Sequence, residues 1–112
     1  MLAKANRLVR ADDYKRLVRR GRRTTSANTV VYLVKSPVES PVRFGFIVSK
    51  AVGIAVVRNL VRRRLKSLGN ELLPVLHPGT DIVIRALPGA AQAGWATLRS
   101  EIFEAVAGGE RR

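Results

Sequence analysis

The sequence has no cysteine, a single histidine and only 8 acidic residues among 112. The missing cysteine excludes disulfides, thiolate metal sites and a cysteine nucleophile, and it fits a reducing compartment. The acidic residues are scattered, with no pairing suited to two-metal phosphoryl transfer, so we expect no metal site in the protein itself. His77 precedes Pro78 in a predicted turn, and we interpret it as incidental rather than as a general base. We therefore expect no catalytic residue in this chain.

Long apolar runs are also missing. No stretch could span a bilayer, and the first residues, MLAKANRLVRADDYKRL, are interrupted by charges before a signal-peptide core could form. We therefore expect a cytoplasmic protein. The length of 112 residues and the hydrophobic fraction of 46% suit one domain with one core. We place that domain at residues 1–108 and expect a disordered tail at 109–112.

The charge is strongly one-sided, with 21 basic residues and a formal net charge of +13. A domain this basic most often binds nucleic acid, because lysine and arginine release condensed counterions from phosphates. A membrane-surface protein would need an exposed helix with opposed basic and apolar faces. A basic surface that serves only solubility is the remaining alternative.

The hydrophobic pattern predicts an α+β fold, a single-domain α/β sandwich in the order α-β-β-α-β-α. Residues 11–20 and 56–68 read as helices, and residues 28–35, 41–50 and 81–87 read as strands. An extra short strand at 22–27 is an alternative to a loop. A last helix at 95–107 would place four residues on one core-facing stripe: Trp95, Leu98, Ile102 and Val106.

The helix predicted at 56–68 carries its cations on one side. On a helical wheel one arc holds five polar residues: Arg58, Asn59, Arg62, Arg63 and Lys66. The opposite arc is apolar and includes Leu60, Val61 and Leu65, with Arg64 as an exception among them. No acid separates these cations, and like charges four residues apart each cost a few tenths of a kcal/mol. The pattern favours a polyanion partner over a merely solvated face.

A longer stretch, RFGFIVSKAVGIAVVRNLVRRRLK from Arg43 to Lys66, resembles the signature of the bacterial ribonuclease P protein subunit. The matching positions are Arg43, Gly45, Val48, Ser49, Lys50, Gly53, Ala55, Val56, Arg58, Asn59, Arg62 and Arg63. The segments RLVRADDYKRLVRRG and TDIVIRAL are also similar to the first helix and last strand of that family. Ala51, Ile54 and Leu60 depart from the family pattern, and we leave them out of the functional residues.

The resemblance implies a non-catalytic protein component of an endonuclease that removes the 5′ leader from precursor tRNA. In that family the chemistry belongs to a large RNA subunit with its Mg²⁺, so the implied partners are that RNA and the leader. No membrane and no small-molecule cofactor are implied. The family's fold also implies an unusual left-handed βαβ crossover, against the general right-handed rule.

The resemblance implies site residues as well. The basic helix residues Arg58, Asn59, Arg62, Arg63 and Lys66 would bind RNA, as would Ser49 and Lys50 in the preceding loop. A leader cleft would include Tyr14, Val18 and Tyr32, with bases stacking on the aromatic rings. The alternatives are that Ser49 caps a turn and that the tyrosines are partly buried core residues. The N-terminal cations Lys4, Arg7 and Arg10 either form a flexible RNA-binding arm or have no such role.

Two other functions compete with this hypothesis. A general RNA-binding module, such as a ribosomal protein or RNA chaperone, would share the charge pattern but not the dependence on one catalytic RNA. A protein-only nuclease would cleave RNA alone with Mg²⁺, and we predict that the isolated chain does not.

Overall fold

The structure, a computed structural model, describes residues 3–36 and 39–110. Four strands form one sheet in the order β1-β2-β4-β3: β1 (Arg22–Thr25), β2 (Thr29–Lys35), β3 (Arg43–Ile47) and β4 (Thr80–Ala86). The first three strands in that order are antiparallel neighbours, whereas β3 runs parallel to β4. The α-helices are α1 (Ala11–Arg20), α2 (Ala55–Leu72) and α3 (Trp95–Glu110). These elements confirm the α+β class, and the segment at 22–27 does contain a strand.

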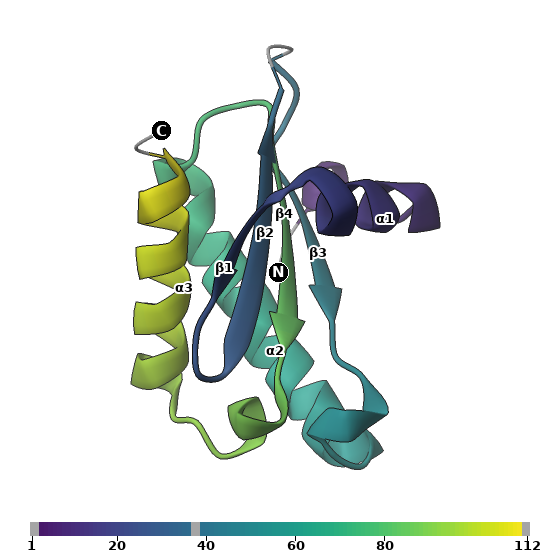
Figure 1. The fold of residues 1–112 in the computed structure, drawn as a ribbon, viewed down its shortest axis with the longest axis vertical. Coiled ribbons are helices and arrows are strands. Elements are labelled where there is room, and N and C mark those ends of the chain that lie inside the picture. The colour runs from purple at the N-terminus through teal and green to yellow at the C-terminus, as the bar shows by residue number, and fades with distance from the viewer. Residues whose placement is uncertain (1–2, 37–38, 111–112) are drawn as a thin grey trace.

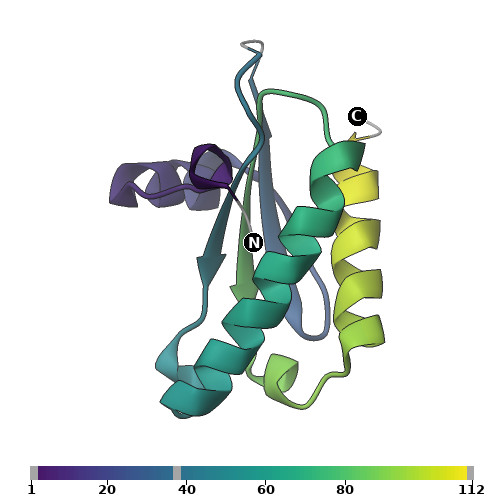
Figure 2. The same ribbon diagram turned by 180° about the vertical axis from the view of Figure 1, so that it is seen from behind.

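The sheet is covered on both faces. Helix α1 crosses one face, and α2 and α3 lie against the other (Figures 1 and 2). The larger core lies under α2 and α3 and includes Phe44, Leu65 and Ile84, each 1% exposed or less. The smaller core lies under α1 and contains Leu8, Leu17, Val30, Tyr32 and Val83. Alternation along each strand divides its side chains between these two cores.

The connection from β3 through α2 to β4 is left-handed. In Figure 2 α2 is in front of the sheet, β3 and β4 both point downward, and the green β4 lies to the right of β3. A right-handed crossover seen from this side would place β4 on the left. The handedness implied by the family resemblance is therefore present. It places the N-terminal half of α2 beside the edge strand β3.

The ends of α1 and the buried face of α2 follow from the sequence. Asp12 and Asp13 lie in the first turn of α1, at the positive end of the helix dipole. Gly21 ends the helix by donating its N–H to the Leu17 carbonyl at 2.8 Å. In α2 the buried stripe runs through Val61, Leu65, Leu68 and Leu72 at helical spacing. This stripe fixes which side of α2 faces solvent.

Two expectations about the core need correction. Leu60 is 41% exposed, because the buried stripe of α2 is narrower than the apolar arc of the wheel. Trp95 is 40% exposed at the first position of α3, whereas Leu98, Ile102 and Val106 are buried as expected. Helix α3 is assigned as far as Glu110, and residues 111–112 lie outside the described residues, so the disordered tail at 109–112 stays a prediction.

Within residues 3–36 and 39–110, none of the helices is both long and apolar enough to cross a membrane.

Candidate nucleic-acid interface

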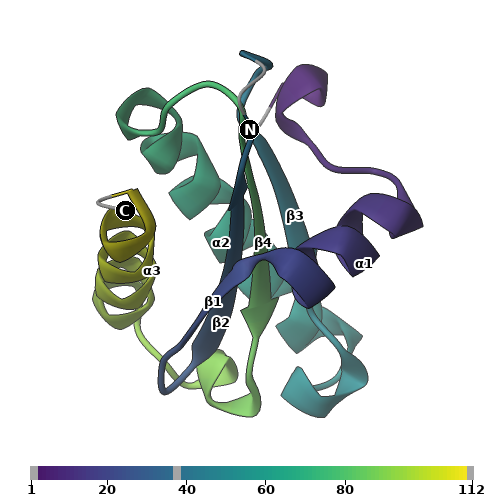
Figure 3. The same ribbon diagram turned by 45° about the horizontal axis from the view of Figure 1, so that its top comes forward.

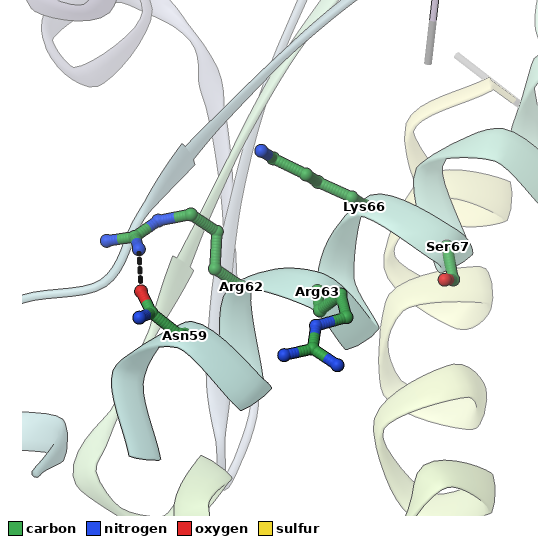
Figure 4. A pocket seen from close by; sticks show the side chains of 5 residues that line it. All are labelled: Asn59, Arg62, Arg63, Lys66 and Ser67. Carbon is green, nitrogen blue, oxygen red and sulfur yellow. Dashed lines mark hydrogen bonds between the residues drawn. The ribbon is translucent and has the colours of Figure 1, made fainter. Parts of the chain in front are cut away.

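A basic hollow lies on the exposed side of α2. It measures about 420 Å³ and is lined by Asn59, Arg62, Arg63, Lys66 and Ser67 (Figure 4). The side-chain amide oxygen Oδ1 of Asn59 accepts a hydrogen bond of 3.0 Å from Nη1 of Arg62, which holds that guanidinium in place. Four of the five residues predicted for this face thus come together. Ser67 was missed, because a lone serine beside Lys66 gives no signal in the sequence.

Arg58 lies differently from the other helix cations. It is half-buried, does not line the hollow, and its Nε has no hydrogen-bond partner among the described residues. Arg64, which the wheel left unexplained, donates from Nη1 to the Ala93 carbonyl at 3.3 Å. Arg64 therefore ties α2 to the segment before α3 and is not part of the basic hollow.

The two predicted loop residues, Ser49 and Lys50, are exposed in the connection between β3 and α2. Ser49 stands at the N-cap of a short 3₁₀ turn, η2 (Lys50–Val52), but its side chain makes no capping hydrogen bond. Gly53 ends the turn with a φ of 156°, a conformation that residues with a side chain rarely adopt. The turn therefore leaves Ser49 and Lys50 facing solvent ahead of α2, where an RNA contact stays a prediction.

A second hollow lies between α1 and the sheet. It measures about 300 Å³, and its lining comprises Tyr14, Lys15, Val18, Arg19, Ile47 and Arg85. Tyr14 and Val18 were expected to share a cleft, and the structure brings them together here. Arg85 was missed because it lies within TDIVIRA, which reads as a buried strand. Its Nε is buried without a hydrogen-bond partner among the described residues. The cleft thus combines apolar surface with three cations.

Tyr32 does not line this cleft. It is 3% exposed in the smaller core, and the Arg85 guanidinium carbon lies 5.9 Å from the centre of its ring. The ring is packed with Leu17 of α1 in this core, and the Arg85 guanidinium lies over it. The expectation that a base stacks on Tyr32 is therefore wrong for this structure. The alternative that Tyr32 is a core residue holds, with Arg85 above it.

Tyr14 of α1 packs against the edge strand β3 and is held there by two hydrogen bonds. Its hydroxyl accepts a hydrogen bond from the Phe46 N–H and donates one to the Leu8 carbonyl, each at 3.3 Å. Its ring lies directly over Gly45, where an added Cβ would approach ring carbons to 2.6 Å. A glycine is therefore required at this position of β3 for the ring to lie flat on the strand.

A third hollow, of about 240 Å³, connects the first two around the edge strand β3. It is lined by Arg7, Leu8, Val9, Tyr14, Phe44, Phe46, Arg62 and Lys66. It shares Arg62 and Lys66 with the basic hollow of α2 and Tyr14 with the cleft under α1. The N-terminal segment is not a free arm here, because Leu8 donates its N–H to the Phe44 carbonyl at 2.7 Å. Surface on opposite faces of the sheet is therefore continuous.

Arg43, although part of the family signature, has a structural role. Its Nε and Nη2 donate to the two oxygens of Asp81 at 3.0 and 2.8 Å, and Arg16 also donates to Asp81 at 2.8 Å. The hydrogen bonds from Arg43 to Asp81 raise the pKa of Arg43, against the opposing effect of burial. Asp81 is 5% exposed, so its charge is compensated almost entirely by these arginines. The network pins α1 to β3 and β4.

Replacing Asp81 by asparagine should lower the free energy of unfolding by about 1–2 kcal/mol, because charge-assisted hydrogen bonds are removed but both arginines keep access to water. Glu71→Gln is the matched control, since the Glu71–Arg99 pair is exposed on both sides and should change stability by under about 1 kcal/mol. Urea unfolding measures both. Equal effects of the two substitutions would contradict the role given to Asp81.

The carboxylates of the described residues are scattered or already engaged by other side chains. Among the described residues there is no group of three histidine, cysteine, aspartate or glutamate side chains close enough to share an ion. Both oxygens of Asp81 accept from arginines, and Glu101 accepts from Asn28 and Thr29. Because Mg²⁺ prefers free oxygen ligands in octahedral geometry, these residues do not fit a protein-held ion.

Comparison with known proteins gives the same family as the signature. A family model described as Ribonuclease P matches residues 2–108. The ribonuclease P protein component of Clavibacter michiganensis subsp. michiganensis is 54% identical over 106 residues, which cover 95% of this chain and 94% of that protein. The corresponding component of Streptomyces avermitilis is 46% identical over 114 residues, covering 95% and 93%.

Solved structures show the same fold at lower identity. The ribonuclease P protein of Staphylococcus aureus matches with a TM-score of 0.81 and 23% identity, over 93% of this chain and 94% of that one. The ribonuclease P protein of Thermotoga maritima matches with a TM-score of 0.75 and 22% identity, over 88% and 92%. With the family match and the close relatives, the resemblance of Arg43–Lys66 is confirmed. This chain belongs to the family of ribonuclease P protein components.

Proposed function

We propose that this chain, as the protein subunit of ribonuclease P, binds the catalytic RNA through α2 and the 5′ leader of precursor tRNA through the cleft under α1. The observation that carries the proposal is the pairing of two unlike surfaces. The hollow on α2 is lined only by polar and charged residues, three of them cations and none of them aromatic, which suits the phosphates of a folded RNA. The cleft under α1 offers Tyr14, Val18 and Ile47 beside cations, which suits an unstacked single strand.

The chemistry of leader removal belongs, in this proposal, to the RNA subunit and the Mg²⁺ that it binds. The protein contributes position and charge. Arg62, Arg63 and Lys66 offset phosphate repulsion where RNA folds against α2, and Arg19 and Arg85 do the same along the leader. Lower electrostatic repulsion should reduce the Mg²⁺ concentration needed for cleavage. A cytoplasmic location, where precursor tRNA is processed in a bacterium, is part of the proposal.

The experiment that tests leader binding compares precursor tRNA with mature tRNA. We expect the complex of chain and catalytic RNA to bind the precursor at least tenfold more tightly, whereas the catalytic RNA alone should show a smaller difference. Each stacked base can contribute about 1–3 kcal/mol, so one base in the cleft would suffice. Equilibrium binding in Ca²⁺, which slows cleavage, measures the affinities. Equal affinities for the two tRNAs would favour a general RNA-binding module.

A further inference from the structure

A further hollow lies on the outer side of α1, beyond the leader cleft. It measures about 380 Å³ and is lined by Asp12, Lys15, Arg16, Arg19 and Arg20. Counted from Asp12, these residues follow the pattern i, i+3, i+4, i+7 and i+8, so they form one stripe along the helix. Two of them, Lys15 and Arg19, also line the cleft under α1. The cleft and the outer hollow therefore meet at the crest of α1, which lies across the sheet in Figure 3.

The cations of this stripe are poorly compensated. Arg16 is paired with Asp81 at 2.8 Å, but Lys15, Arg19 and Arg20 have no carboxylate within ion-pair distance among the described residues. Lys15 and Arg19 are like charges four residues apart, as are Arg16 and Arg20, so each pair is slightly destabilising. Arg22 and Arg23 follow directly in β1. The positive charge thus increases toward the C-terminal end of α1.

Favourable interaction with the helix dipole explains only part of this charge. A helix C-terminus carries the equivalent of about half a negative charge, which one or two cations would offset. Arg19, Arg20, Arg22 and Arg23 exceed that need. At the other end of the stripe, Asp12 would repel a phosphate. The arrangement is polarised, with one end of the hollow suited to anions and the other not.

We propose that the outer hollow of α1 is a second phosphate-binding subsite for the leader. A single strand that leaves the cleft crosses α1 between Lys15 and Arg19 and continues to Arg20, turning away from Asp12. No aromatic side chain lines the outer hollow, so this subsite binds the backbone and has no base preference. The inference rests on the proposed leader binding and extends it to nucleotides farther upstream of the cleavage site.

The test is a leader-length series, because the subsite acts only on leaders long enough to cross α1. Precursor tRNAs with uridine leaders lengthened one nucleotide at a time are bound to the complex of chain and catalytic RNA. The variants are Arg20→Gln, which removes the charge from the outer hollow alone, and Arg20→Lys, which keeps it. Arg99→Gln on α3 removes one charge far from α1 and serves as the control, since Arg99 is paired with Glu71.

We expect affinity to rise in two stages as the leader lengthens, and Arg20→Gln to remove several-fold of the second stage while leaving short leaders unchanged. Only for long leaders should it lower the magnitude of the salt slope, by about 0.7. Arg20→Lys should restore the slope, and Arg99→Gln should change neither stage. A second stage that is unchanged in Arg20→Gln overturns the subsite and leaves leader binding intact. An affinity independent of leader length at every step overturns both proposals.

Discussion

Replacing Arg62, Arg63 and Lys66 together by alanine should weaken binding to the catalytic RNA about a thousandfold. Each side chain is expected to donate a charge-assisted hydrogen bond to phosphate worth about 1.5 kcal/mol, and 1.4 kcal/mol corresponds to a factor of ten. All three line one hollow, so one RNA segment should bind them together. The magnitude of the salt slope should fall by about 0.7–0.9 for each phosphate that is no longer neutralised. Filter binding over a range of salt concentrations measures both quantities.

The same substitutions should leave stability unchanged or slightly raised, because they relieve repulsion on α2 and replace no core residue. To control for net charge, we compare two single substitutions that each remove one positive charge. Arg63→Ala removes it from α2, and Arg99→Ala removes it from α3. Arg63→Ala should weaken RNA binding about tenfold, and Arg99→Ala should have little effect, since Arg99 packs on Phe103 and pairs with Glu71. Similar effects of the two substitutions would mean that only total charge matters.

Tyr14→Ala should remove most of the preference for precursor over mature tRNA, a ten- to hundredfold loss if one base stacks on the ring. Tyr14 lines both the cleft and the hollow that joins it to α2, so its removal opens the surface where the two meet. Tyr14→Phe keeps the ring and should keep most of the preference. Affinities for precursor and mature tRNA in the complex with catalytic RNA measure the effect.

Stability must be followed in parallel, because the Tyr14 hydroxyl also bonds to Phe46 and Leu8. Tyr14→Phe removes these hydrogen bonds and reports their contribution, about 0.5–1.5 kcal/mol each. If Tyr14→Phe abolished the precursor preference as fully as Tyr14→Ala, the hydroxyl and not stacking would be responsible. If Tyr14→Ala kept the preference, the cleft would not hold the leader through this ring.

The basic face of α2 was predictable because charge and hydrophobicity alternate there with the helical period. The helical wheel alone was enough to group four of the residues that line the basic hollow: Asn59, Arg62, Arg63 and Lys66. Arg58 and Leu60 lie at the borders between faces, where the wheel cannot decide. Arg58 is half-buried and Leu60 is exposed, because the rotation of α2 about its own axis against the sheet decides which border residues are covered.

The cleft was only partly predictable, because strand alternation does not tell which face of the sheet a helix leaves open. Tyr32 and Arg85 project from neighbouring strands to the same side, since Tyr32 is opposite Val83 in the register. The longer Arg85 side chain covers the tyrosine, so the cation reaches the surface in place of the ring. The role of Arg64 could not be predicted, because its hydrogen-bond acceptor, the Ala93 carbonyl, is distant in sequence and no local pattern points to it.

We propose that this chain assists an RNA enzyme and is not itself a nuclease. The direct measurement is cleavage of precursor tRNA at low Mg²⁺ by the chain alone, by the matching ribonuclease P RNA alone, and by both together. We predict release of the intact leader only in the combined reaction, with no cleavage by the chain alone at any Mg²⁺ concentration. Cleavage by the isolated chain, or a combined reaction no faster than the RNA alone with well-folded protein, would contradict the claim.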